Sequence, residues 1–552
     1  MELYKLKRGG ALAVTLIIIL CLSFWYHSAP NKIMAPKKLI MLSEKEPEAQ
    51  RTNMTMNFKI PTENPKIASQ IQREVDEIVN QIESMITKVE LLHKDNTTCA
   101  EKSKATIVNP KTSYCVGDNL VVQVDVFDYL GNRKTYGGDY LRARISTKEL
   151  NAGASGKIED FHNGTYHVHF TLYWEGKIDL SILLKHPSEA VSVLWNTRNS
   201  WYGYVDYSGK FTNQNQQTET KCGFDLNKSE ELCEYNDERD EEYFYCMKPP
   251  SYECDMLTET KSWTSGRSKL TELEATLFDK SSLRVEIPKD FQPVIVTSCN
   301  NNTDRKKHEK CGIGMKLEYP SGHFMNNVWI PHACSMKSNH NLEELNACMQ
   351  GKVIYILGDS TLRQWMLYFQ SKLNDMTILN LYESGWAQKI WGIDLKRNMR
   401  VSWKRHANPF ISSSYQSFRE ERTIPREIDL IGGHDKTVIV LNIGCHFRSY
   451  PVHHYIRRLV NIRRALVRLF RRSPETKVIL KTENLSAISN SYEINSDFHG
   501  FVHYFVFKLI FKDLNVGFVN GWDMTNAFDA KEVHPPPEYI QNEIDLFMTY
   551  IC

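Results

Sequence analysis

Four short apolar runs in residues 351–552 constrain the fold of this chain more than any other feature. They read VIYIL, VIVLN, VILKT and VGFVN, and continuous apolar runs of this length are typical of strands buried on both faces. Segments with helical periodicity lie beside them at 361–373, 452–472, 499–513 and 536–550. Strands that alternate with helices form parallel sheets. The sequence therefore predicts an α/β domain over residues 351–552.

The region before this domain has a different periodicity. Between residues 99 and 205, apolar and polar residues alternate in runs such as NLVVQVDVFD and TYHVHFTLYW, separated by NAGASGK and FHNGT. Alternating runs between turn-forming clusters predict a β-sandwich. Residues 206–350 carry eight cysteines and an acidic stretch, so we expect a disulfide-stapled connector. Its strand-like piece SSLRVEIPKD pairs either with the sandwich or with the following domain.

The N-terminus carries a targeting signal. Three basic residues precede the apolar run GALAVTLIIILCLSFWY, which ends in aromatic residues. Residues 1–27 are therefore either an uncleaved signal anchor or a signal peptide. The first alternative predicts a type II Golgi membrane protein with a lumenal chain, and the second predicts a secreted protein. Residues 28–98 form a stem in either case, and residues 28–66 lack apolar periodicity.

An amphipathic helix is predicted at the end of the stem. Apolar residues from Ala68 to Leu92 recur at alternating steps of three and four. Two alternatives explain this seam. It forms a short coiled coil that oligomerises the protein through residues 68–92, or it packs on its own domain.

Cysteines and glycosylation signals agree with a secretory location. Of thirteen cysteines, Cys21 lies in the apolar run, and the other twelve are expected to be mostly disulfide-bonded. No CxxC pair occurs, so no metal site is expected. Basic and acidic residues nearly cancel at 68 and 66, which gives no overall bias toward nucleic acid. Six sequons predict N-glycosylation: Asn53, Asn96, Asn163, Asn227, Asn301 and Asn484.

A serine lies at the end of the first predicted strand of the α/β domain. In open α/β sheets, ligands bind beyond the carboxyl ends of the strands. Gly358 and Ser360 lie at such an end, because they follow the run VIYIL. The alternative is that Asp359 or Ser360 only caps the next helix.

Chemistry-bearing residues follow other strands of the same domain. Asn442, Gly444 and His446 follow the second run, and Asp523, Asp529 and His534 follow the last one. A serine nucleophile needs a base, an orienting acid and donors for the oxyanion. All four parts occur at strand ends.

These residues carry a family resemblance. GDSTLRQW, VLNIGCHF and the C-terminal histidine resemble the PC-esterase branch of the SGNH-like hydrolases and acyltransferases. The preceding sandwich resembles a filamin-type immunoglobulin repeat. Together with the Cys-rich connector, these motifs are similar to the neurexophilin and PC-esterase (NXPE) family. The resemblance implies that Ser360 is the nucleophile, that His534 is the base, and that the Ser360 N–H, Gly444 and Asn442 shape the oxyanion hole.

The sequence departs from this family at the catalytic acid. The resemblance places an acid three residues before the histidine, but Lys531 occupies that position. Asp529 and Asp523 are the candidates, and Asp529 is favoured because it shares a short loop with His534. A Ser-His dyad without an acid is the third alternative. Arg363, one turn beyond Ser360, either holds an anionic substrate group or is solvated.

The resemblance implies acyl-ester chemistry on carbohydrate. We expect an O-acetyltransferase or acetylesterase that acts on glycans of glycoproteins, with sialic acids as one acceptor class. No tightly bound cofactor is expected, and acetyl-CoA is a candidate acyl donor. The alternative function is a secreted or cell-surface neurexophilin-like binding glycoprotein with a degenerate esterase domain.

Overall fold

The computed structural model describes residues 69–199, 204–227, 229–279, 284–299, 308–338, 340–380, 389–486 and 492–552. Residues 67–552 form one compact unit. The expected signal segment and most of the stem lie outside the described residues. Within the described ranges, no helix is long and apolar enough to cross a bilayer.

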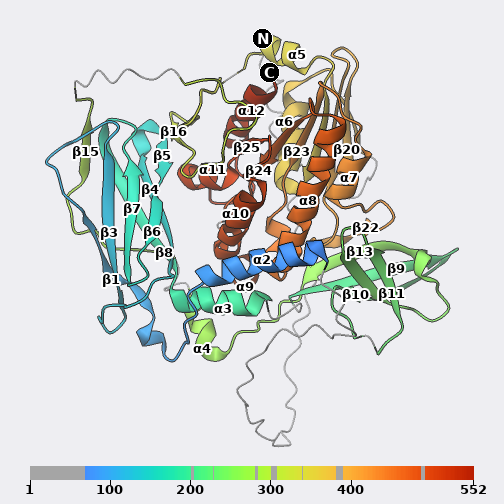
Figure 1. The fold of residues 1–552 in the computed structure, drawn as a ribbon, viewed down its shortest axis with the longest axis horizontal. Coiled ribbons are helices and arrows are strands. Elements are labelled where there is room, and N and C mark those ends of the chain that lie inside the picture. The colour runs from blue at the N-terminus through green and yellow to red at the C-terminus, as the bar shows by residue number, and fades with distance from the viewer. Residues whose placement is uncertain are drawn as a thin grey trace, which may run out of the picture. The chain divides into compact units, whose positions relative to one another are not determined.

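A seven-stranded sheet forms the α/β domain at the C-terminal end of the chain (Figure 1). Its order is β19 (Thr377–Asn380), β20 (Lys389–Asp394), β21 (Met399–Arg405), β18 (Val353–Gly358), β23 (Thr437–Leu441), β24 (Lys477–Lys481) and β25 (Gly517–Val519). The five adjacent strands from β21 to β25 are parallel, whereas β20 pairs antiparallel with both β21 and β19. The predicted α/β class is confirmed, with the four apolar runs as strands. β21 was not predicted because its sequence MRVSWKR interrupts apolar residues with charges.

Helices cover both faces of this sheet. α6 (Ser360–Lys372) and α12 (Pro537–Ile551) share a hydrophobic core with Ile354, Ile356 and Val440. α8 (Val452–Arg472) and α10 (Asp497–Phe511) pack with Ile439 and Leu441, which alternate to the opposite face. α7 (Ile424–Leu430) lies on that second face too. The sheet is therefore a buried middle layer.

The predicted sandwich is present. One sheet has the order β1 (Thr98–Ile107), β3 (Asn119–Asp128), β7 (Thr165–Thr171) and β6 (Lys157–Asp160). The other has the order β17 (Val328–Pro331), β16 (Gly322–Met325), β5 (Ala152–Ser155), β4 (Tyr140–Thr147), β8 (Gly176–His186), β15 (Val294–Thr297) and β2 (Tyr114–Cys115). One apolar core joins Val122 and Phe170 of the first sheet to Ile145 and Leu180 of the second. The strand-like piece pairs with the sandwich, because β14 (Val285–Glu286) lies against β8.

The predicted Cys-rich connector contains a sheet of its own. Its order is β11 (Leu232–Asp237), β12 (Glu242–Met247), β10 (Gln216–Gly223), β9 (Val205–Asn213), β13 (Leu257–Thr264) and β22 (Ser412–Ser417). β22 comes from the α/β region, which ties the two parts together. Because acidic residues break up the apolar alternation, the sequence did not predict this sheet.

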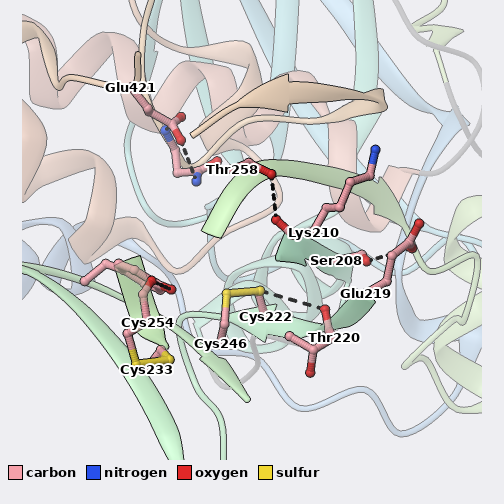
Figure 2. Close-up of a disulfide and its surroundings, with 12 residues drawn as sticks. Ser208, Lys210, Glu219, Thr220, Cys222, Cys233, Cys246, Cys254, Thr258 and Glu421 are labelled. Carbon is pink, nitrogen blue, oxygen red and sulfur yellow. Dashed lines mark hydrogen bonds between the residues drawn. A yellow bond between two sulfur atoms is a disulfide. The ribbon is translucent and has the colours of Figure 1, made fainter. Parts of the chain in front are cut away.

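Disulfides hold this sheet and close longer loops. Cys222 and Cys246 are register partners on β10 and β12, and their bond lies near the Cys233–Cys254 bond (Figure 2). A Cβ at Gly209 would lie 2.5 Å from the Cys222 sulfur, so glycine makes room for the bond. The remaining bonds are Cys115–Cys299, Cys311–Cys334 and Cys348–Cys552. Cys99 and Cys445 are free, so the expectation of mostly paired cysteines is confirmed.

The predicted amphipathic helix packs on its own chain. α2 (Gln70–Met85) buries Ile71, Val75, Ile78 and Ile82 in the core that contains α8. Across the same contact, Glu74 pairs with Arg464 at 3.1 Å. The apolar seam is therefore buried within one chain over residues 70–85, as the second alternative predicts, and oligomerisation through residues 68–92 stays a prediction.

The arginine-rich face of α8 is likewise used within the chain. Arg458 donates to Glu242 and to the Asn408 carbonyl, and Arg468 pairs with Asp429. These side chains connect α8 to neighbouring elements.

Candidate active site

Ser360 lies where the order of the parallel strands reverses. In chain order the five parallel strands run β18, β21, β23, β24 and β25, and in space β18 lies between β21 and β23. The connection after β18 therefore leads to β21 on one side, whereas the connection after its neighbour β23 leads to β24 on the other, which opens a crevice at the carboxyl ends of these two strands. Ser360 is the first residue of α6, directly after β18, and is half-buried. Its N–H belongs to the first helical turn, where backbone N–H groups lack intrahelical partners.

The structure brings Ser360 and His534 together across 174 residues of chain. The Ser360 Oγ lies 2.7 Å from the His534 Nε2. Both sequence neighbours of His534 are held by amide side chains: Asn484 Nδ2 donates to the Val533 carbonyl at 2.9 Å, and Gln364 Nε2 donates to the Pro535 carbonyl at 2.9 Å. The imidazole is therefore positioned by backbone contacts on both sides.

The pKa of His534 suits a proton acceptor. Desolvation by the surrounding atoms lowers this pKa from its ordinary value, and the negative charge of Asp359 opposes the change. The positive charge of Arg363 lowers the pKa further. The imidazole is consequently neutral near pH 7 and can accept the Ser360 proton.

Asp359 also lies at this site, although the sequence predicted only a helix-capping role for it. It does cap α6, because its Oδ1 accepts from Thr361 N at 2.9 Å and from Thr361 Oγ1 at 2.7 Å. Its Oδ2 accepts from the Cys445 thiol at 3.5 Å, and the residue is only 1% exposed. Burial and the Asp359 charge raise the pKa of Cys445 well above its ordinary value, so the thiol stays protonated. Asp359 thus brings a buried negative charge to the catalytic edge, a role the motif signals only by its position beside the serine.

Two glycines at the candidate oxyanion hole leave room for neighbouring atoms that a larger side chain would displace. A Cβ at Gly358 would lie 2.3 Å from the Asn442 carbonyl oxygen, and one at Gly444 would lie 2.6 Å from the Glu483 side chain. Asn442 is 1% exposed, and its Nδ2 donates to the Lys481 carbonyl at 3.1 Å. That bond holds the end of β23 to the end of β24.

A pair of histidines at the same edge has a defined protonation pattern. His406 is fully buried, and its Nδ1 lies 2.8 Å from the Ala407 carbonyl, which can only accept. Burial lowers the pKa of His406 well below its ordinary value, so the ring is neutral and its Nε2 must accept. The donor is His446 Nδ1 at 3.0 Å. Burial also lowers the pKa of His446, and its Nε2 therefore remains an unprotonated acceptor.

The two candidate acids make their contacts elsewhere. Asp529 pairs with Lys531 at 2.6 Å, with Arg142 at 3.5 Å and with Arg144 at 3.6 Å. Asp523 is fully buried and accepts from the N–H and hydroxyl of Ser321. Neither carboxylate lies within hydrogen-bonding distance of His534 in the described part of the chain. We therefore do not assign the orienting role to Asp529, because its charge is already shared among three cations.

Arg363 lies beside the site, with its guanidinium 5.9 Å from the centre of the Trp403 ring. Burial lowers its pKa, but not enough to remove the charge at neutral pH. Arg363 thus contributes positive charge next to His534.

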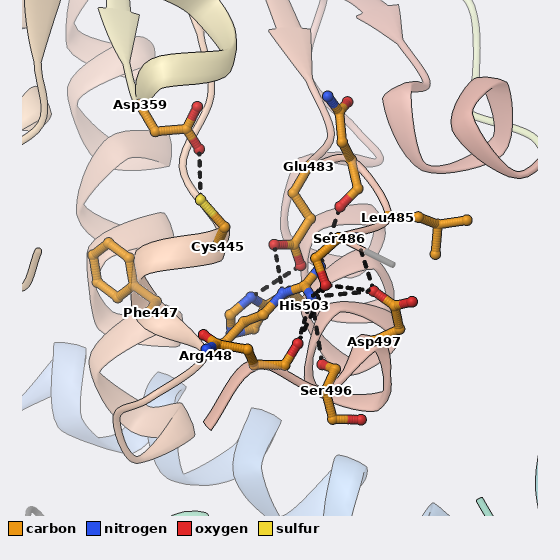
Figure 3. Close-up of polar contacts among 12 residues, drawn as sticks. Asp359, Cys445, Phe447, Arg448, Glu483, Leu485, Ser486, Ser496, Asp497 and His503 are labelled. Carbon is orange, nitrogen blue, oxygen red and sulfur yellow. Dashed lines mark hydrogen bonds and ion pairs between the residues drawn. The ribbon is translucent and has the colours of Figure 1, made fainter. Parts of the chain in front are cut away.

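A buried charge network supports the loops behind the site (Figure 3). Arg448 pairs with Glu483 and with Asp497, each at 3.2 Å, and also donates to the Asn484 carbonyl. Glu483 in turn contacts His503 at 3.1 Å. The network connects the loop after β23 to the loop after β24 and to α10, and so fixes the segments that carry Gly444 and Asn484.

The sequons fall in different environments. Asn96, Asn163 and Asn227 are exposed and remain predicted glycosylation sites, whereas Asn53 and Asn301 lie outside the described residues. Asn484 is 1% exposed with its amide nitrogen bonded to Val533, so the folded chain has no room for a glycan there. The expectation for Asn484 is corrected accordingly. Over the same described ranges, no group of three or more His, Cys, Asp or Glu side chains is arranged to hold a metal ion.

Comparison with known families identifies both halves of the chain. Residues 83–262 match the neurexophilin family, and residues 329–552 match the C-terminal domain of proteins similar to NXPE family member 4. The first match includes most of the Cys-rich sheet, and the second contains Ser360 and His534. These matches define a protein in which a neurexophilin region precedes an NXPE C-terminal domain. The chain belongs to the NXPE family.

Two solved structures show local likeness. The crystal structure of the Lin-41 filamin domain is 17% identical, with a TM-score of 0.13, over 16% of this chain and 82% of that one. Invasin, a bacterial integrin-binding protein, is 10% identical with a TM-score of 0.13, over 56% of this chain and 60% of that one. These scores are too low to support an argument about fold or function.

Proposed function

We propose that this protein is a serine-dependent O-acyltransferase or acylesterase of the secretory pathway that acts on glycans. The observation that carries the proposal is the 2.7 Å contact between Ser360 Oγ and His534 Nε2 at the reversal point of the parallel sheet. Five disulfides support the oxidising compartment.

The proposed reaction has two steps. Ser360 Oγ attacks an acyl carbonyl while His534 Nε2 takes its proton, and the oxyanion lies near the Ser360 N–H and Gly444. The leaving group departs with the proton from His534. A sugar hydroxyl or water then attacks the acyl carbon while His534 takes its proton. The bond from the acyl carbon to Ser360 Oγ breaks, and His534 returns the proton to Oγ, which releases the O-acylated sugar or the carboxylic acid. Acetyl-CoA is a proposed acyl donor, and glycoprotein sialic acids are a proposed acceptor class.

The proposed charge support for His534 comes from Asp359 instead of an acid on the histidine loop. Asp359 is buried and its charge raises the pKa of His534. Such a charge stabilises the imidazolium that forms during each step, although it leaves the orientation of the ring to the contacts of Asn484 and Gln364.

A second candidate function is a secreted or cell-surface binding glycoprotein with an inactive α/β domain. The observation in its favour is that Asp529 pairs with Arg142, Arg144 and Lys531 instead of His534. The location also has two candidates, a Golgi membrane and the extracellular space.

A fluorophosphonate probe tests the enzyme proposal. We expect the purified protein to be labelled covalently and Ser360→Ala to lose the label. Ser371→Ala is the matched control, because Ser371 is exposed on the same helix and bonds only locally to Tyr368 in the described structure. An unlabelled parent protein, or labelling that persists in Ser360→Ala, would favour the binding glycoprotein.

A further inference from the structure

A large cavity lies away from Ser360. Its volume is 610 Å³, within the roughly 300–1,000 Å³ of small-molecule sites. The end of α2 and strands β4 and β6 line one part of it, and helices α10 and α11 (Gly521–Phe528) line another. All five of these elements are labelled in Figure 1.

The lining is mainly apolar and aromatic. Phe501 and Met85 line the cavity and are 44% and 49% exposed, which gives it an apolar mouth. The deeper aromatic side chains include Tyr140, Tyr319 and Trp522. A ligand that fills this space must therefore have a substantial apolar body.

The polar groups of the lining favour an anion. The two aspartates are already bonded within the protein: Asp139 accepts from Tyr166 and Ser188, and Asp160 accepts from Gly138 and His162. The exposed cations Lys157 and Lys508, in contrast, form no ion pair within 4.0 Å in the described ranges.

One buried acceptor in the lining also lacks a partner. Asn526 is 2% exposed, and its Nδ2 donates to Ser155 at 2.9 Å and to the Ala143 carbonyl at 3.2 Å. Of the two terminal atoms of the Asn526 amide, only the nitrogen can donate to the Ala143 carbonyl, so this bond fixes the orientation of the amide. Its Oδ1 is buried without a hydrogen-bond partner in the described structure. Because this oxygen is itself buried, a ligand donor would reach it only after the Asn526 side chain shifts.

We propose that this cavity binds an amphiphile with an acyl chain and an anionic head group. The chain occupies the aromatic interior, and the head group lies near Lys508 and Lys157. A free fatty acid and a lysophospholipid share this chemistry.

The cavity is connected to the loop that carries His534. Arg142 lines the cavity and also pairs with Asp529 at 3.5 Å. Binding in the cavity nevertheless uses neither Ser360 nor His534, so the proposal stands independently of the esterase chemistry.

Fluorescence titration with cis-parinaric acid, a fluorescent fatty acid, tests the proposal on the full chain. We expect saturable binding that Ser360→Ala retains unchanged. Lys508→Glu should weaken binding about tenfold, since it replaces attraction for the head group with repulsion. Phe501→Ala should weaken it also, because it removes part of the apolar mouth.

Lys512→Glu is the matched control, since Lys512 is exposed just beyond the end of α10 and does not line the cavity. Thermal unfolding of each variant establishes that the fold is retained. Displacement by lysophosphatidate, by oleate or by both supports the proposal and identifies the source of the chain. No saturable binding, or equal weakening in Lys508→Glu and Lys512→Glu, would overturn it.

Discussion

Asn484 offers the most direct test of how His534 is positioned. The side chain is buried, its Nδ2 donates to the Val533 carbonyl at 2.9 Å, and its Oδ1 accepts from the Lys481 ammonium at 2.7 Å. Both bonds lie beside the loop that carries His534. A substitution at Asn484 should therefore affect both the stability of the fold and the position of His534.

The expected magnitudes follow from these two bonds. A hydrogen bond to a charged group contributes about 1.5–3 kcal/mol, and a neutral one about 0.5–1.5 kcal/mol. Asn484→Ala removes both, so the free energy of unfolding should fall by about 2–5 kcal/mol. Asn484→Asp keeps an acceptor for Lys481 and loses only the donor to Val533. Its stability should fall less than that of Asn484→Ala.

Asn484→Asp should nevertheless lose much of its activity, although its stability falls less than that of Asn484→Ala. Without the donor at 484, the Val533 carbonyl is released, and a carboxylate beside it repels the carbonyl oxygen. A displacement of about 1 Å in a catalytic group can cost about 10²-fold in rate. We therefore expect Asn484→Asp to lose about 10²-fold in the rate of fluorophosphonate labelling.

The assay compares labelling rates with chemical denaturation for the parent and both variants. Gln364→Ala provides a comparison on the other side of the histidine, because its bond to Pro535 is only partly buried. A folded Asn484→Asp that labels at the parental rate would refute the positioning role of Val533.

Four further outcomes are expected. Asp529→Asn should label within about twofold of the parent rate, because its carboxylate pairs with cations instead of His534; a loss of about 10⁴, as for an orienting acid, would restore its catalytic role. The labelling rate should rise with pH through a midpoint below about 6.5, since His534 must be neutral and desolvation lowers its pKa. Asp359→Asn retains a favoured helix cap but removes the charge that raises this pKa, so the midpoint should move to lower pH, and an unchanged midpoint in the same pH series would contradict the role given to Asp359. Ile82→Ala should lower the free energy of unfolding by about 2–5 kcal/mol without changing the molar mass by light scattering, since Ile82 is buried within one chain; a change in mass would instead indicate an intermolecular seam.

The sequence by itself determined the layers of the molecule and the proposed pair of Ser360 and His534. Continuous apolar runs specify strands buried on both faces, and the alternation in residues 99–205 specifies a sheet with one buried face. Ser360 was identifiable because the carboxyl end of such a strand is where open α/β sheets bind ligands. His534 was identifiable from its motif, and the structure places it 2.7 Å from Ser360.

The tertiary structure decided which partner each side chain has. The seam of α2 fits a second copy or its own domain equally well in periodicity, whereas in the tertiary structure its residues share a core with the apolar side chains of α8. Asp529 is five residues before His534, yet Arg142 and Arg144 approach it from the sandwich. Spacing along a loop cannot reveal cations that arrive from a separate sheet nearly 400 positions earlier in the chain, because hydrogen bonds and ion pairs depend on distance in space.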